Sequence, residues 1–237
     1  MTEHIYKKYD AELIQLQSML AQMGGLAEDQ LARAIEALAK RDTEAADRII
    51  VADDKIDALE LAIEEMAVLI IAKRQPMALD LRDIMVAIRV ASDLERIGDL
   101  AKNIAKRTLA IAEHHPRRIM NGLVRMGKLA LGQLKEVLDA YAQRDEAKAL
   151  AVWRSDEDID ALYNSIFREL LTYMMEDPRT IGLCTHLLFG AKNIERIGDH
   201  CTNVAENVYY LVNGTPLTDE RPKKDRTSIM PIGELDK

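Results

Sequence analysis

A hexapeptide with two carboxylates occurs twice in the chain, as LERIGD from Leu94 to Asp99 and as IERIGD from Ile194 to Asp199. In each copy a Glu and an Asp stand four positions apart, and residues four apart share one face of a helix. Carboxylate pairs of this kind supply the oxygen ligands that Mg²⁺, Mn²⁺, Ca²⁺ or iron prefer over zinc. The pattern therefore predicts binding of a multivalent cation, with Mg²⁺, Mn²⁺ or Fe as the candidates.

A second acidic pair precedes each copy. Residues 41–59 align without a gap with residues 144–162, matching Arg-Asp at the start and Ile-Asp-Ala-Leu at the end, so the chain is an internal duplication. Asp57 and Glu95 are equally distant from Pro76 along the chain, which sets them level in an antiparallel helical hairpin folded at that proline. The predicted metal ligands are eight carboxylates: Asp53, Asp57, Glu95, Asp99, Asp156, Asp160, Glu195 and Asp199.

Two alternatives compete with a cation site. Acidic pairs on the flank of a bundle can be solvated faces, neutralised here by Arg89, Arg96 and Lys102, and helical-wheel geometry places these pairs on an exposed flank. A ferritin-like di-metal oxidase would need Glu-x-x-His motifs facing inward, and no Glu in this sequence has a His three residues later. His200 is a candidate extra ligand, but a lone His is more often structural. We find no nucleophile arrangement and predict that the protein is not an enzyme.

The elements that position these residues are helices. Only 4% of the residues are aromatic, good helix formers dominate, and all six prolines fall where the apolar periodicity breaks. We therefore predict an all-α protein of two tandem antiparallel three-helix bundles, with a kink or break at Gly24–Gly25. The predicted helices are 5–40, 43–74, 78–113, 117–143, 145–176 and 179–212; the predicted domains are 1–115 and 116–213, followed by a mobile polar tail, 214–237.

Charge and composition limit the partners. The net charge of −8 and the pI of about 5.3 disfavour nucleic acid and anionic lipid. Two isolated cysteines make neither a disulfide framework nor a CxxC metal site. The longest apolar run is far shorter than a membrane span, and the first residues have no secretory pattern. We expect a cytoplasmic protein without membrane insertion.

The two ERIGD motifs, each followed by an Asn four residues after the Asp and preceded by a DxxxD segment, resemble those of the PhoU family of phosphate-signalling proteins. The resemblance runs from about residue 5 to 212. It implies two three-helix bundles whose E(D)xxxD motifs hold surface metal clusters in some members. It also implies a homodimer that represses the phosphate regulon, acting as an adaptor between the ATPase subunit of a phosphate ABC transporter and a sensor histidine kinase. A metal-free helical scaffold is the remaining alternative.

Overall fold

The structure, a computed structural model, describes residues 2–111 and 117–218, with side chains from residue 8 and from residue 119 in the two segments. This part of the chain is helical and contains no strand, which confirms the predicted all-α class. The predicted bounds agree with the observed ones to within a turn, apart from a break at Asp53. The elements are α1 (Thr2–Lys40), α2 (Thr43–Ala52), α3 (Asp54–Arg74), α4 (Leu79–Ala110), α5 (Arg117–Gln143), α6 (Glu146–Glu176), the 3-10 helix η1 (Pro178–Thr180) and α7 (Ile181–Asn213).

The Arg-Asp pair at the start of each aligned segment forms a helix-to-helix junction. Arg41 and Arg144 adopt left-handed backbone conformations, with φ of 59° and 53°. The carboxylates of Asp42 and Asp145 then accept hydrogen bonds from the backbone N–H three residues later, at 2.8 and 3.0 Å. A left-handed residue ends one helix and an Asp cap satisfies a free donor of the next, so the same dipeptide forms the same turn in both repeats.

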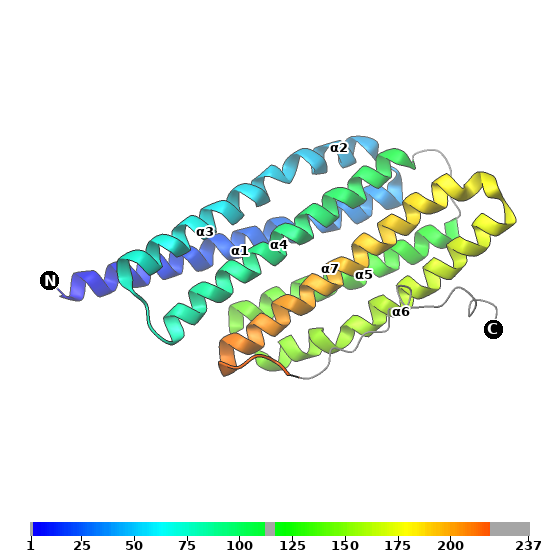
Figure 1. Cartoon of the computed structure of the whole chain (residues 1–237). Coiled ribbons are helices and arrows are strands. Elements are labelled where there is room, and N and C mark those ends of the chain that lie inside the picture. Colours follow the sequence, from blue (N-terminus) through cyan, green and yellow to red (C-terminus); the bar gives the residue numbers. More distant parts are fainter. Residues whose placement is uncertain (1, 112–116, 219–237) are drawn as a thin grey trace.

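The six long helical segments form two antiparallel bundles that lie side by side (Figure 1). In the first repeat α1 and α4 pack with α2 and α3, and in the second repeat α5 packs with α6 and α7. The repeats meet along a seam where α4 contacts α7 and α1 contacts α5. The interior between the helices is filled mainly by Leu, Ile, Val and Ala side chains. This arrangement confirms the predicted pair of three-helix bundles.

Glycines allow α1 and α5 to approach closely at the seam. A Cβ on Gly24 would lie 2.8 Å from the Leu138 side chain, and a Cβ on Gly127 would lie 2.8 Å from the Ile35 side chain. These are the same contact made twice, because Gly24 and Ile35 correspond in the duplication to Gly127 and Leu138. Of the predicted kink or break at Gly24–Gly25, the break is wrong, since α1 is continuous there. The space for Leu138 accounts for Gly24.

The helix predicted over 43–74 is interrupted at Asp53, where α2 ends and α3 begins. The Ile56 N–H donates to the Asp53 carbonyl at 2.8 Å, while the longer bond from the Asp57 N–H measures 3.3 Å. The tighter turn lies at Asp53, whose side chain is the most deeply buried of the eight predicted carboxylates. The second repeat has no matching break, because α6 continues through Asp156.

At the other end of the chain, α7 ends at Gly214, which has a φ of 77° and donates its N–H to the Tyr210 carbonyl. The predicted tail beyond Thr218 and the predicted join at 115–116 lie outside the described residues. In the two described segments, no helix is both long and apolar enough to cross a membrane.

Candidate functional site

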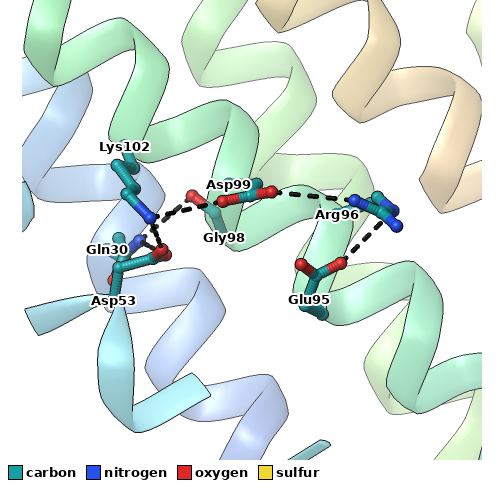
Figure 2. A network of polar contacts seen from close by, with 7 residues as sticks. All are labelled: Gln30, Asp53, Glu95, Arg96, Gly98, Asp99 and Lys102. Carbon is teal, nitrogen blue, oxygen red and sulfur yellow. Dashed lines mark hydrogen bonds and ion pairs between the residues drawn. The ribbon is translucent and has the colours of Figure 1, made fainter. Parts of the chain in front are cut away.

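Asp53 is the centre of a polar network that joins three helices of the first repeat (Figure 2). Its side chain is fully buried, with an exposed fraction of 0%. Lys102 Nζ on α4 lies 2.6 Å from Asp53 Oδ2, and Gln30 Nε2 on α1 donates to Asp53 Oδ1 at 2.6 Å. The same Gln30 amide donates to the Gly98 carbonyl at 3.0 Å. A buried carboxylate needs such partners because desolvation strongly disfavours an isolated charge.

The ERIGD carboxylates lie one turn apart along α4 and are bridged by cations of their own helix (Figure 2). Arg96 Nε is 3.3 Å from Glu95 Oε2, and Arg96 Nη1 is 3.7 Å from Asp99 Oδ2. Lys102 Nζ reaches Asp99 Oδ1 at 3.5 Å as well as Asp53. Lys102 therefore links the acidic residue at the α2–α3 break to the acidic stripe on α4.

Carboxylates from α3 and α4 influence each other electrostatically. Burial raises the pKa of Glu95, and the negative charges of Asp99, Glu60 and Asp57 raise it further against the opposing effect of Arg96. Burial also raises the pKa of Asp57, followed by the charge of Asp53. The structure thus brings the predicted acidic pairs of the first repeat to the same side of the hairpin, as the residue counts about the proline predicted.

The predicted position of the carboxylates on an exposed flank is wrong for half of them. Four are buried, with exposed fractions of at most 4%: Asp53, Asp156, Asp160 and Glu195. For Asp53 and Asp156 the reason is close packing against the motif glycines. A Cβ at Gly98 would be 3.2 Å from Asp53 Oδ1, and a Cβ at Gly198 would be 3.0 Å from Asp156 Oδ1. The helical wheel considered one helix at a time and could not show this approach of a neighbour.

The second repeat keeps the acidic residues but places its cation differently. Lys192 Nζ lies 2.8 Å from Glu195 Oε1, whereas the position that corresponds to Lys102 is Thr202. The Thr202 hydroxyl donates to the Asp199 carbonyl at 2.7 Å. Lysine therefore neutralises a different carboxylate of the set in each repeat.

Two buried glutamines that the acidic motifs do not indicate also belong to these networks. Gln30 belongs to the Asp53 network, and Gln133 is buried beside Gly198, donating to the Ser155 hydroxyl at 3.0 Å. The signal that reveals them is the repeat period, because Gln30 and Gln133 are separated by the same interval as Asp53 and Asp156.

His200 lies at the seam between the repeats. Its Nδ1 is 2.9 Å from Asp93 Oδ1 on α4, and Asn203 donates to the same oxygen at 3.2 Å. These contacts give His200 a structural role that joins α7 to α4.

The acidic sets meet some of the needs of a metal site and lack others. The oxygen-only donor set and the accumulated negative charge around Glu95 suit a hard cation. As the side chains lie, however, residues 8–111 and 119–218 contain no group of three Asp, Glu, His or Cys that could hold one ion. Arg96 and Lys102 provide positive charge in the first repeat instead. Metal binding thus stays a prediction, and it requires these flexible cationic side chains to move.

Known proteins match the chain in both sequence and structure. A family model described as the PhoU domain matches residues 20–108 and 123–208. The phosphate-specific transport system accessory protein PhoU homolog of Rhizobium meliloti is 54% identical over 228 residues, 96% of each chain. The protein of the same name from Caulobacter vibrioides is 51% identical over 226 residues, 95% of this chain and 98% of the relative.

Solved structures agree with this result. The crystal structure of PhoU from Pseudomonas aeruginosa matches with a TM-score of 0.85 at 41% identity, covering 87% of this chain and 100% of that one. The phosphate transport system regulatory protein PhoU from Streptococcus pneumoniae matches with a TM-score of 0.82 at 32% identity, covering 88% and 99%. Both ERIGD motifs fall within the matched domains, and the chain belongs to the PhoU family.

Proposed function

We propose that the protein is a negative regulator of phosphate uptake and of phosphate-starvation genes. It acts as a cytoplasmic homodimeric adaptor between the ATPase subunit of a phosphate ABC transporter and its sensor histidine kinase, associated peripherally with these membrane complexes. The observation that carries the proposal is the family assignment, since relatives matched over nearly their full length are named phosphate-specific transport system accessory proteins. The di-metal oxidase alternative has no comparable support.

The geometry favours a protein that acts by binding a partner and not by converting a substrate. Asp53 and Glu195 are buried and held by lysines, so these carboxylates stabilise helix positions and are poorly placed to meet a small substrate. A regulator of this kind needs different affinities for two states of its partner, typically 1–3 kcal/mol of coupling. Helices fixed by buried polar contacts give such a partner a defined surface to recognise.

Deleting the gene is expected to derepress a phosphate-starvation reporter in phosphate-rich medium by about tenfold or more, the range that such coupling supports. A variant with Glu95→Gln, Asp99→Asn, Glu195→Gln and Asp199→Asn should derepress it partly at unchanged protein abundance. The matched control replaces four exposed carboxylates by the same chemistry: Glu44→Gln, Asp47→Asn, Glu136→Gln and Asp139→Asn. Full repression by the first variant would remove the ERIGD carboxylates from the mechanism, and full repression in the deletion strain would overturn the regulatory role.

We further propose that a multivalent cation, Mg²⁺, Mn²⁺ or Fe, binds each acidic set. The support is the oxygen-only donor set together with the raised pKa of Glu95 and of Asp57, to which burial contributes most and the neighbouring carboxylates contribute next. The predicted ligands in the first repeat are Asp53, Asp57, Glu95 and Asp99, with Asp156, Asp160, Glu195 and Asp199 in the second. Bound cation would neutralise this charge and stabilise the native state by mass action.

Thermal melts with and without Mn²⁺ test this proposal. At neutral pH the cation is expected to stabilise the wild type by about 2.7 kcal/mol when its free concentration is a hundred times the dissociation constant. The folded pKa of Glu95 is raised above 4.5, so without cation its ionisation costs stability as pH rises through that pKa. The Mn²⁺ effect should therefore weaken as pH falls through the raised pKa of Glu95, and it should shrink in an Asp57→Asn, Glu95→Gln, Asp99→Asn variant. Equal shifts in variant and wild type at neutral pH would contradict these sites.

A further inference from the structure

The helix α3 is apolar on two opposite sides. Its inner side contributes buried residues such as Ile56, Ile63 and Ile70 to the core. Its outer side exposes Leu61, Val68 and Leu69, with exposed fractions of 60%, 61% and 50%. A surface helix of a globular protein normally has one apolar stripe and a polar opposite face. The outer side of α3 is therefore an unpartnered apolar surface.

The apolar residues of this outer side share one stripe along the helix. Spacings of three, four and seven residues occur among them, which is the pattern of a single helical face. The stripe rises roughly 21 Å at 1.5 Å per residue. Contiguous exposed apolar surface of this kind marks interaction sites more often than isolated residues do. We call it the α3 stripe, and its members are Ala58, Leu61, Val68, Leu69 and Ala72, all exposed.

Carboxylates flank the α3 stripe along its length, and the nearest basic residues of α3, Lys55 and Lys73, lie just beyond its two ends. Residues 56–72 contain four carboxylates and no Lys or Arg. Glu64 and Glu65 are exposed on α3 beside the stripe. Burial and the charge of Glu64 raise the pKa of Glu60, which shows that these carboxylates act on one another. An occupant of this face must therefore combine apolar side chains with positive charge.

The second repeat shows that the fold does not require the α3 stripe. When the alignment of residues 41–59 with 144–162 is continued at the same offset, Leu61 corresponds to Asn164, Glu65 to Arg168 and Leu69 to Thr172. Two other stripe positions stay apolar, since Val68 corresponds to Leu171 and Ala72 to the exposed Met175. The middle of this side is polar in the second repeat and carries an arginine, so the apolar Leu61 and Leu69 beside an acidic Glu65 belong to the first repeat alone.

We propose that the α3 stripe docks an amphipathic helix of a partner protein, whose apolar side chains lie on Leu61, Val68 and Leu69 and whose Lys or Arg residues face the acidic rim. Docking of an apolar helix face, with charges that set its orientation, is a common mode of recognition. An anionic lipid surface is disfavoured because the rim is acidic. A second copy is disfavoured because two acidic rims would face each other. The assignment deepens the proposed regulatory function by giving the adaptor a partner-binding face.

The test uses the full chain and a fluorescent helical peptide of about 18 residues, five turns, with Leu on one face and Lys flanking it. We expect saturable binding measured by anisotropy. The triple variant Leu61→Asn, Glu65→Arg, Leu69→Thr, which copies the second repeat, should weaken binding at least about tenfold, or 1.4 kcal/mol. The control variant Ile14→Asn, Met175→Thr removes two other exposed apolar side chains and should bind like the wild type. Circular dichroism verifies that all variants are folded.

Several outcomes would overturn the proposal. These are equal affinity of the triple variant and the wild type, equal affinity for a peptide with Glu in place of Lys, and absence of saturable binding. Self-association that the triple variant abolishes would assign the stripe to a second copy. Stripe-dependent co-sedimentation with phosphatidylglycerol vesicles would assign it to lipid. The peptide assay is independent of the reporter strain, so failure of this surface and failure of the regulatory function are distinguished.

Discussion

Replacing Lys102 by Met is expected to lower the free energy of unfolding by about 3 kcal/mol, because it leaves the carboxylate of Asp53 buried without its ammonium partner. Lys102 Nζ lies 2.6 Å from Asp53, and the Lys102 side chain is 22% exposed, so the lower end of the range for buried pairs applies. Urea unfolding at pH 7, followed by circular dichroism, measures the change. The control is Lys106→Met, one turn further along the exposed side of α4.

The pH dependence separates lost charge pairing from lost packing. In the wild type the hydrogen bond with Asp53 raises the pKa of Lys102 above 10.5. The stabilisation by the ammonium is therefore complete below pH 10.5 and declines as pH rises through the raised pKa. The loss in Lys102→Met should therefore shrink at alkaline pH, where the wild type also lacks the ammonium charge. Adding Asp53→Asn should recover part of the stability at neutral pH; a loss that is the same at every pH and in the double variant would contradict the ion-pair account.

Gly198→Ala is expected to destabilise the protein by about 1–2 kcal/mol, although alanine is the better helix former. The new methyl group would lie 3.0 Å from Asp156 Oδ1 and 3.1 Å from Ile159 Cδ1, and overpacking of this kind costs about 1–3 kcal/mol. The gain in helix propensity, up to about 1 kcal/mol, offsets part of that cost. The thermal unfolding midpoint should fall accordingly.

The same helix provides the matched control for this substitution. Gly190 also lies within α7, but a Cβ there would meet nothing within 4 Å. Gly190→Ala is expected to stabilise the protein by up to about 1 kcal/mol through helix propensity alone. Opposite signs for the two glycines would establish that Gly198 is kept for the approach of α6. Stabilisation by both alanines would show that the neighbouring side chains adjust without cost.

Much of the fold follows from local signals in the sequence. Helix ends are predictable because proline, the left-handed Arg and the capping Asp act on the backbone within a few residues. The register of Asp57 against Glu95 is predictable for a similar reason. The rise per residue is constant, so residues equally far from the turn of an antiparallel hairpin lie level along the helix axes. The duplication supports these predictions, because the same junction sequence occurs in both repeats and predicts the same helix ends in each.

Burial of the acidic residues was not predictable from the same signals. Whether Asp53 is solvated or enclosed depends on how closely the α2–α3 segment approaches α4 at Gly98, and on Gln30 of α1, which bonds Asp53 and the Gly98 carbonyl. The break of the helix at Asp53 has no proline or glycine to mark it. These features arise from contacts between helices, and a helical wheel describes one helix.

The paired glycine contacts at the seam have a consequence for the origin of the molecule. Gly24 receives Leu138 and Gly127 receives Ile35, so each half offers the other the same knob and the same hole. Such self-complementarity is what defines an isologous interface between two identical subunits related by a twofold axis. The chain thus resembles a symmetric dimer of one ancestral bundle whose subunits have become covalently joined. The repeated glycine contacts fix the register of one half against the other.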